Sequence, residues 1–592
     1  MGDVAALHSS VPGRRGNGNG RELLVVLLLL VVNLALVAPD LMTPFAEVNP
    51  YDEAKYVDSG RSLLLLEMRD LSWGPMVAFV YAPLHIVLDG YADWFLLEIW
   101  AGRILLYAGL WLATLYLASR FRDRFHPFVA AGILFVSIVF IPVVENQSDA
   151  VFVILTCVAL AAVFDFLRTK RLIHVGVASL LIGAGVLARV ESILLIPILA
   201  GLAIAAGRRH HAWGRILATA LGPSLAILGI YALVGFGLTG DLHHLDLGGK
   251  AWDSFEVNQS VLTGGDLEQG RLETRRLFGT QEENNGSVLR AVSRNPAAFA
   301  RRIVANIGGI PDSYFAFYGK RLGPALLLLS GWGIYRLFRR REVWPLLALG
   351  LWTVPAFVSL AFLPRHLVPQ VSYLPIVLAS AGLCVPFVAE SSQTERLLFT
   401  LSVAAFTLVG WFGLKPALVL GGVMMLVALS IIWLQRDLLA QDGRTPVVPF
   451  LIMFAAALIL RGEFAYPNYP RAGASSMEQV VHLMQASLPP GSIVLERVPL
   501  PALAAEMVAL ESSALAEASH PALQSPAALC AWLREEDVKG VYLDQSLISS
   551  AGHLADLVNR LVGSGLSVVG GSPDSSPVLV VEDPCRAPAA DE

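Results

Sequence analysis

Long apolar segments recur along most of this chain, and they restrict its fold more than any other feature of the sequence. A helix needs about 17 to 25 apolar residues to cross a bilayer. Segments of this kind lie near residues 23–38, 95–119, 127–143, 149–167, 172–188, 192–207, 215–236, 323–338, 344–363, 367–389, 397–413, 416–434 and 446–461. The sequence therefore predicts a polytopic α-helical membrane protein with about thirteen transmembrane helices.

The amino-acid composition supports a membrane protein. Of the 592 residues, 55% are hydrophobic and 15% are charged, whereas soluble domains carry about a quarter of charged residues. The net charge of -5 excludes the basic surface that nucleic-acid binding needs. The apolar stretch from Leu23 to Val37 is not followed by a small-residue cleavage pattern, so we expect it to be a retained first span and not a signal peptide.

Positive charges alternate along the predicted loops. Short cytoplasmic loops carry an excess of Lys and Arg. Such clusters fall in successive even connections, at residues 120–124, 168–171, 208–215, 336–341, 396 and 436–444. The N-terminus is therefore predicted to be cytoplasmic. The apolar segment Pro75–Leu88 would invert every later cluster if it crossed the membrane, so we predict an interfacial or re-entrant helix on the outer side.

This topology divides the chain into three parts. Residues 1–22 form a cytoplasmic tail, residues 23–461 form the transmembrane domain, and residues 462–592 form a soluble domain on the outer side. Within the transmembrane domain, residues 39–94 and 237–322 are predicted to be outer loops. Function is expected on this outer side, because the substantial loops gather there.

The segment after residue 462 alternates helix-like and strand-like stretches. Helices are expected near residues 475–487, 524–536 and 551–563, and strands near residues 493–498, 540–543, 567–569 and 578–581. This alternation predicts a small α/β domain. It contains no glycine-rich phosphate-binding pattern, so a structural or acceptor-presenting role is favoured over catalysis. Its Cys530 and Cys585 could form a disulfide in an oxidising compartment.

The second outer loop contains an amphipathic helix. Asn295 and Pro296 are typical of an N-cap and a first helical position. Two faces of the helix come after them, one with the apolar residues Phe299, Ile303, Val304 and Ile307 and another with Arg301 and Arg302. The pattern fits a helix lying on the membrane surface, or an ordinary amphipathic loop helix without lipid contact.

Paired acids follow the first span. Asp52 and Glu53 open a predicted helix that continues with Lys55 and Tyr56. Acids in a first helical turn are favoured by the helix dipole, which gives them a structural explanation. A carboxylate at the membrane face is equally what a general base needs.

A polar run separates the third and fourth predicted spans. It contains Glu145 and Asp149, with Ser148 between them. Helix capping by Ser148 and Asp149 explains part of this run. Two carboxylates between apolar helices exceed what capping requires, and charge parity brings them to the same membrane face as Asp52.

Two arginines also lie at predicted span ends. Arg189 and Glu191 are bounded by apolar residues on both sides, and ionisable groups at membrane depth are functional candidates; a buried structural ion pair is the alternative. Arg365 and His366 lie at the outer end of the ninth span. An arginine there can bind phosphate oxygens through two nitrogens.

In their order along the chain, these motifs resemble those of the GT-C membrane glycosyltransferases, in particular the protein O-mannosyltransferases and the aminoarabinose transferases of lipid A. The matching stretches are Tyr51–Tyr56, Asp149, Arg189–Glu191 and Arg365–Pro369. The resemblance covers about residues 20–390. It implies a GT-C fold, a polyprenyl-phosphate-linked sugar as donor, and inverting transfer to a hydroxyl of a protein, lipid or glycan at the outer membrane face.

The resemblance also implies residue roles. Asp52 would be the general base, with Glu53 and Asp149 as the other catalytic acids. The donor phosphate would be bound by Arg365, Arg189 and His366. Supporting contacts would come from Glu145, Glu191, Tyr56, Lys55, Tyr81 and His85.

Several alternatives stay open at the level of sequence. Asp52 and Asp149 could hold a divalent cation through their oxygens, although related enzymes also work without metal. A polysaccharide polymerase or ligase, or a transporter or flippase with an outer sensory domain, would also have many spans. Transporters place polar sites near the midplane, whereas the acids here gather at one predicted face. We therefore favour a glycosyltransferase of the bacterial cytoplasmic (inner) membrane with a periplasmic C-terminal domain.

Overall fold

The computed structural model describes most of the chain. The described residues are 19–42, 50–66, 74–88, 94–121, 137–240, 248–259, 262, 267–319, 322–361, 367–383, 385, 391–412, 416–434, 452, 455–456, 459, 474–496, 505, 507–511, 520–542, 552–562, 566–570 and 578–581.

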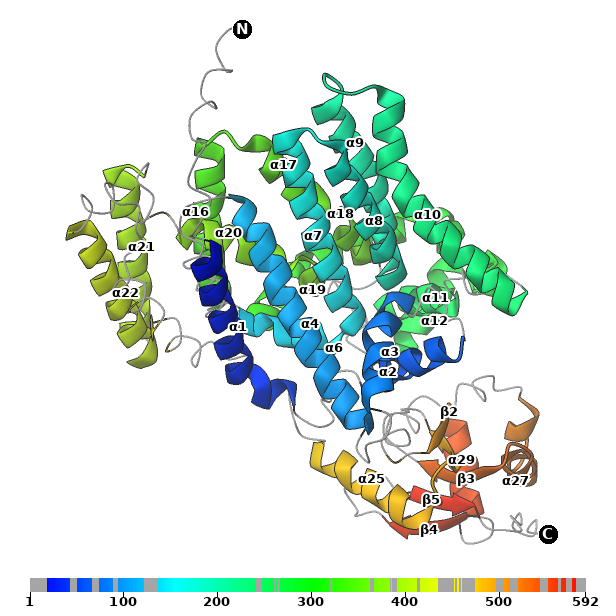
Figure 1. Ribbon diagram of the computed structural model, residues 1–592. Coiled ribbons are helices and arrows are strands. Elements are labelled where there is room, and N and C mark those ends of the chain that lie inside the picture. Colours follow the sequence, from blue (N-terminus) through cyan, green and yellow to red (C-terminus); the bar gives the residue numbers. More distant parts are fainter. Residues whose placement is uncertain are drawn as a thin grey trace.

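Long apolar helices run side by side and form a bundle (Figure 1). They are α1 (Asn19–Leu41), α4 (Trp94–Ala118), α7 (Gln147–Thr169), α8 (Leu172–Ala188), α9 (Leu195–Gly207), α10 (Trp213–Thr239), α16 (Leu322–Arg339), α17 (Val343–Trp352), α20 (Tyr373–Leu383), α21 (Gln393–Phe412) and α22 (Pro416–Leu434). Five helical segments are long and apolar enough to cross a membrane, and five shorter apolar ones accompany them among the described residues. The predicted spans at 127–143 and 446–461 lie mostly outside those residues, so the number thirteen stays a prediction.

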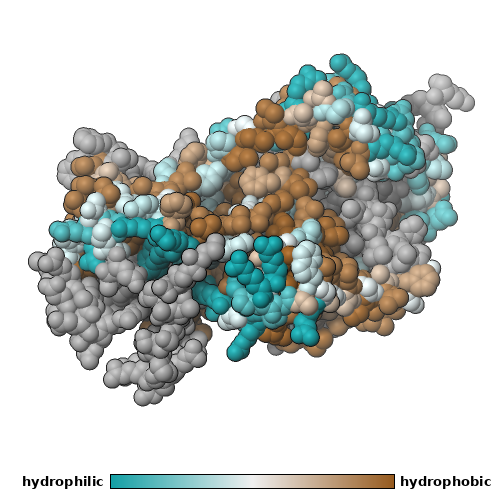
Figure 2. Space-filling model, turned by 90° about the horizontal axis from the view of Figure 1, so that it is seen from above, coloured by the Kyte–Doolittle hydropathy of each residue, from teal (hydrophilic) through white to brown (hydrophobic). Residues whose placement is uncertain are grey.

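The bundle surface is apolar where it is expected to face lipid. Figure 2 shows hydrophobic residues over much of one face, with hydrophilic residues gathered in patches. On α10, Ile230 and Leu233 expose 61% and 73% of their surface. Such exposure would be unfavourable in water, and it fits a helix that contacts lipid.

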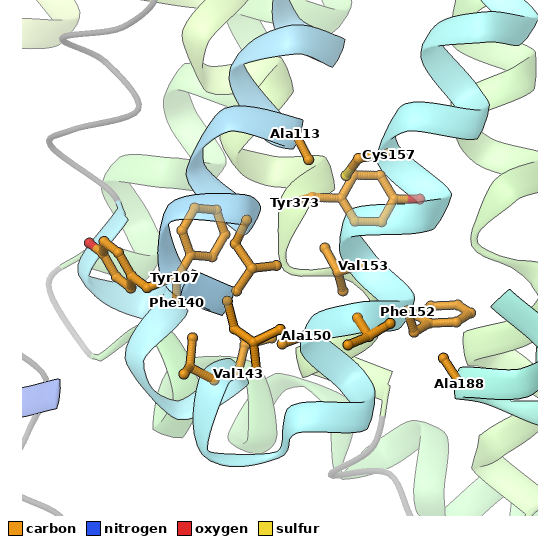
Figure 3. Packing of buried hydrophobic residues seen from close by; sticks show 14 of the residues in the cluster. Tyr107, Ala113, Phe140, Val143, Ala150, Phe152, Val153, Cys157, Ala188 and Tyr373 are labelled. Atoms are coloured by element: carbon orange, nitrogen blue, oxygen red, sulfur yellow. The ribbon is translucent and has the colours of Figure 1, made fainter. Parts of the chain in front are cut away.

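The interior of the bundle is closely packed around α4 and α7. The rings of Tyr107 and Phe140 lie edge to face, with centroids 6.3 Å apart. Figure 3 shows Val153 and Cys157 of α7 beside the ring of Tyr373. These apolar contacts fix α7, whose first turn carries Asp149, against its neighbours.

Short helices interrupt the bundle at its ends and at prolines. They are α2 (Pro50–Leu64), η2 (Pro75–Val77), α3 (Ala78–Leu88), η3 (Ser119–Phe121), η4 (Ser137–Phe140), α6 (Ile141–Glu145), η5 (Val190–Leu194), α18 (Val354–Val358), η9 (Ser359–Ala361) and α19 (Leu367–Val371). The predicted single span 344–363 is broken into α17, α18 and η9, with Pro355 at the start of α18. A proline has no N–H to donate to the preceding turn, which favours such a break.

The apolar segment Pro75–Leu88 forms η2 and α3. It packs against α2 and α4, and Figure 1 shows it at the same end of the bundle as the C-terminal sheet. Gly60 of α2 allows this packing, because a Cβ there would lie 2.6 Å from Cβ of Tyr81. The segment therefore joins α2 to the bundle end.

The segment predicted to be the second outer loop folds into short helices around one buried arginine. The helices are α11 (Gly248–Asn258), α12 (Leu267–Phe278), η8 (Glu282–Asn284), α13 (Val288–Arg294), α14 (Pro296–Gly308) and α15 (Ile310–Tyr318). The predicted N-cap is confirmed, because Asn295 Oδ1 accepts from the backbone N–H of Ala298. The prediction grouped Arg302 with Arg301 on one face of this helix, but Arg301 is exposed and Arg302 is buried. The guanidinium of Arg302 packs against the rings of Phe255 and Phe278, and desolvation lowers the pKa of Arg302 to about 10.

A five-stranded sheet with flanking helices occupies the C-terminal part. Its elements are α25 (Ala474–Ser487), β1 (Ile493–Glu496), β2 (Val508–Glu511), η13 (Pro521–Leu523), α27 (Pro526–Glu535), β3 (Val538–Tyr542), α29 (Gly552–Leu561), β4 (Leu566–Gly570) and β5 (Val578–Val581). The strand order is β2-β1-β3-β5-β4. Strand β1 pairs in parallel with β2 and β3, and β5 pairs antiparallel with β3 and β4. The strand β2 was not predicted from the sequence.

Candidate functional site

Helix α2 contributes a buried tyrosine to a polar cluster at one end of the bundle. Tyr56 is 3% exposed, and its hydroxyl donates a hydrogen bond of 2.9 Å to Ser148 Oγ at the start of α7. The backbone of Asp52 and Glu53 belongs to α2, and the side chains of both acids lie outside the described residues. Asp52 precedes Tyr56 by one helical turn, so the predicted base is carried by the helix that docks on this cluster.

The polar run between α6 and α7 forms its own hydrogen-bond network. Asn146 leaves the helical conformation, with φ -98° and ψ 83°, and separates the two helices. Its carbonyl accepts from the backbone N–H of Asp149 at 2.9 Å, and its amide Nδ2 donates to Asp149 Oδ2 at 2.6 Å. The predicted side-chain capping of α7 is not observed, and Asp149 instead turns into the protein.

Asp149 is the centre of this network. Its side chain is fully buried, and Oδ1 lies 3.4 Å from Nη1 of Arg189. The amide Nε2 of Gln370 in α19 donates to the same oxygen at 3.4 Å. A buried carboxylate is costly unless it is paired and hydrogen-bonded, and these partners satisfy both conditions.

Arg189 lies between α8 and η5, where the chain is extended. Its Nη2 donates to Glu191 Oε1 at 3.1 Å, so one guanidinium contacts two carboxylates. Its Nε is buried and has no hydrogen-bond partner in the part of the chain that the structure describes. The predicted Arg to Glu pair is therefore present, and it is extended by Asp149.

A glycine lets the segment before η2 approach this turn. Gly74 has φ +63°, a left-handed conformation that favours glycine. A Cβ at this position would lie 2.6 Å from the carbonyl oxygen of Ala188 and 3.3 Å from Cβ of Ser148. Segments from α2, η2, α7, η5 and α19 thus meet at one place.

The other predicted supporting residues lie nearby in the fold or outside the described part. His85 of α3 bonds Glu98 of α4, with 2.8 Å between Nδ1 and Oε1. Tyr81 is buried against Gly60 and Gly102. Glu145 ends α6, and Lys55 is half-buried on α2. Arg365 and His366 lie outside the described residues, directly before α19.

The sequence did not identify Asn146 or Gln370 as residues of the cluster. It identified Ser148 as a capping residue and did not predict its hydrogen bond with Tyr56. Gln370 is 1% exposed and lies five residues after Arg365. An amide side chain inside an apolar segment was the signal that could have identified it. The partner of Gln370 is 221 residues away in sequence, so its contact could not be read from any local motif.

The charges around Asp149 bear on the predicted cation site. No group of three or more His, Cys, Asp or Glu side chains that could hold a metal ion occurs among the described residues. The oxygens of Asp149 face three nitrogen donors, from Asn146, Arg189 and Gln370. A divalent cation on the same oxygens would be repelled by the guanidinium, so the observed arrangement fits an acid that neutralises an arginine.

Two solved structures show which fold this arrangement belongs to. The structure of ArnT from Cupriavidus metallidurans bound to undecaprenyl phosphate superposes with a TM-score of 0.53 at 14% sequence identity, and the match covers 97% of this chain and 100% of that chain. The chain has the ArnT fold. The apo structure of the same protein also gives a TM-score of 0.53 at 14% identity, and that match covers 96% of this chain and 99% of that one. ArnT is the lipid A aminoarabinose transferase, a GT-C glycosyltransferase, so the predicted GT-C fold is confirmed.

The likeness to ArnT is one of fold. No protein-family model matches the chain, and no curated protein matches it by sequence. The roles of the residues around Asp149 therefore have to be inferred from their own geometry and chemistry.

Proposed function

We propose that this protein is an inverting glycosyltransferase that moves a sugar from a polyprenyl-phosphate donor to an acceptor hydroxyl at the outer face of the membrane. One observation carries the proposal: α2, the start of α7, the Arg189 turn and α19 converge at one end of a bundle with the ArnT fold. The convergence supplies an arginine held by the buried Asp149 and the partly exposed Glu191, next to the helix that bears Asp52.

The proposed reaction needs two groups from the protein. The acceptor oxygen forms a bond to the anomeric carbon while the bond from that carbon to the phosphate oxygen breaks, and the lipid phosphate leaves with the bonding electrons. The hydroxyl proton passes to the carboxylate of Asp52. A positioned general base supplies about 10²- to 10⁴-fold in rate.

The leaving phosphate needs fixed positive charge. Arg189 supplies it in this proposal, because Nη1 and Nη2 are held by Asp149 and Glu191 while Nε remains for a phosphate oxygen. Arg365, directly before α19, supplies the second charge, with His366 beside it. Preorganised charge of this kind usually contributes the largest share of the rate enhancement.

The proposal also includes the location of the protein. We propose that the N-terminus lies in the cytoplasm of a bacterium and that residues 462–592 form a periplasmic domain, which presents the acceptor or supports the fold. Figure 1 shows the C-terminal sheet at the same end of the bundle as α2 and α3, which supports a common side for the sheet and the cluster around Asp149.

The test measures release of undecaprenyl phosphate by the purified full-length protein in detergent. Undecaprenyl-phosphate-linked glucose, mannose and 4-amino-4-deoxyarabinose are offered as donors, with and without a detergent extract of bacterial envelope as acceptor. At least one donor should be cleaved. Failure to cleave any of them, by a protein that still unfolds cooperatively on heating, would contradict the proposal.

Substitution of the acids assigns the base. Asp52→Asn should lower turnover below about a tenth of wild type, given the size of general-base effects, and Glu53→Gln should be milder. Glu283→Gln is the matched control, because Glu283 is exposed and pairs with Arg294 in the outer loop. The reverse order of severity for Asp52 and Glu53 would move the base to Glu53.

A further inference from the structure

The amide oxygen of Gln370 has no role in the proposed reaction. The amide group has two ends, an NH2 donor and a carbonyl acceptor. Asp149 is a carboxylate and accepts only, so the NH2 group must face Oδ1 of Asp149, as the 3.4 Å contact shows. The amide oxygen of Gln370 is thereby turned away from Asp149.

This amide oxygen is buried without a partner. Gln370 is 1% exposed, and its Oε1 accepts no hydrogen bond from the residues that the structure describes. Buried acceptors are rarely left unsatisfied in native proteins. A group that donates a hydrogen bond to Oε1 is therefore expected in the working protein.

The surroundings indicate the class of that group. Arg189 and Gln370 contact the same oxygen of Asp149, so the two side chains meet at one carboxylate. Together they offer one unused donor for an anionic oxygen, Nε–H of Arg189, and one unused acceptor for a hydroxyl or amino group, Oε1 of Gln370. A sugar phosphodiester offers both partners, a phosphate oxygen and, a few bonds away, a sugar hydroxyl.

We infer that Gln370 is a specificity-determining residue whose amide oxygen accepts a hydrogen bond from a hydroxyl or amino group of the donor sugar, next to the phosphate held by Arg189. The inference rests on the proposed function, since it needs a lipid-linked sugar in this place. It assigns to the site a preference for sugars that keep this hydrogen-bond donor near the anomeric carbon.

The experiment compares a donor with its monodeoxy analogues. The donor is whichever of the three undecaprenyl-phosphate sugars the wild-type protein cleaves, and each analogue lacks one hydroxyl or, for the amino sugar, the amino group. Wild type should disfavour one analogue by about 5- to 100-fold in kcat/KM, because the missing group leaves Oε1 unsatisfied. Gln370→Met keeps a side chain of similar length and lacks the amide oxygen. This variant should lower kcat/KM for the intact donor and give the same kcat/KM for the intact donor and the disfavoured analogue.

A second variant separates this role from an effect transmitted through Asp149. Asn146→Ala removes the other amide that holds Asp149 and leaves Gln370 intact. It should lower kcat/KM equally for the intact donor and the disfavoured analogue, so that their ratio stays that of wild type. Gln370→Asn shortens the side chain by one methylene and should abolish the preference for the intact donor. This variant also tests the inference if Gln370→Met fails to fold.

Binding of the lipid without the sugar gives a further readout. Undecaprenyl phosphate alone should inhibit wild type and Gln370→Met with the same inhibition constant, because it lacks the sugar hydroxyl. Discrimination that persists in both Gln370 variants, or its absence in wild type, would overturn the inference while the glycosyltransferase activity stands. A wild-type protein that cleaves no lipid-linked sugar would instead contradict the proposed function.

Discussion

The ion pair between Asp149 and Arg189 gives the sharpest test of the site. Asp149→Asn removes one charge and keeps the shape of the side chain. Two unit charges 3.4 Å apart attract by about 5 kcal/mol at an effective dielectric constant of about 20, and the loss of one partner from a buried pair costs about 3–5 kcal/mol. Glu191 still contacts Arg189 at 3.1 Å, so we expect the lower end, about 3 kcal/mol.

A double-mutant cycle measures this coupling. If Asp149 acts by holding Arg189 in its catalytic orientation, 3 kcal/mol corresponds to about 10²-fold in kcat/KM. The variants Asp149→Asn and Arg189→Gln and their combination are assayed for release of undecaprenyl phosphate. The double variant should be no worse than Arg189→Gln alone within about a factor of three, because contacting residues are not additive.

An ion pair at the opposite end of the bundle is the matched control. Arg120 and Asp165 are 3.1 Å apart, and their side chains are 24% and 21% exposed. Asp165→Asn should leave donor kinetics unchanged and cost less than about 1 kcal/mol of stability, measured by thermal unfolding in detergent. Additive effects of Asp149→Asn and Arg189→Gln, or an Asp149→Asn variant with nearly wild-type kcat/KM, would refute the assignment of Asp149 as the residue that orients Arg189.

Three further outcomes are expected. Arg365→Ala should raise KM for the donor and lower kcat, with only partial rescue by lysine, because a single ammonium lacks the two-pronged geometry of arginine; unchanged kinetics would leave the phosphate to Arg189. Gly74→Ala should lower activity at least tenfold, as its Cβ would clash with the carbonyl oxygen of Ala188 at 2.6 Å; equal activity would show that this approach is not needed. Cys530 is disulfide-bonded in the structure, and Cys585 is its predicted partner. A thiol-alkylating reagent added to the denatured, unreduced protein should therefore modify neither cysteine. Alkylation of both cysteines without prior reduction would exclude the disulfide.

Several membrane helices could be predicted from the sequence to within a residue or two. The predicted segment 172–188 coincides with α8 (Leu172–Ala188), and 416–434 coincides with α22 (Pro416–Leu434). Apolar length suffices for these helices, because a segment in lipid must satisfy its backbone hydrogen bonds internally. The strand β2 (Val508–Glu511) was not predicted, because its Val-Ala-Leu-Glu sequence also suits a helix and only the pairing with β1 makes it a strand.

The candidate site was predictable in its charged residues and not in their contacts. Asp149, Arg189 and Glu191 could be identified because ions are costly next to apolar spans. Their arrangement depends on the packing of α7 against α8 and on α19, and no local pattern specifies which oxygen faces which nitrogen. The contact of Tyr56 with Ser148 joins residues 92 positions apart, and it became visible only with the fold.

The position of the ions along the helices favours the proposed glycosyltransferase over a transporter. Asp149 lies in the first turn of α7, and Arg189 directly follows α8. Arg103 lies inside α4, yet its guanidinium donates to the carbonyl oxygen of Leu41, the last residue of α1. A secondary transporter would instead place its polar site near the bilayer midplane on broken helices. In the described part of the bundle, Asp149 and Arg189 lie at helix ends, which is where the proposed reaction needs them, because a lipid phosphate would lie at the membrane surface while its prenyl chain stays in the bilayer.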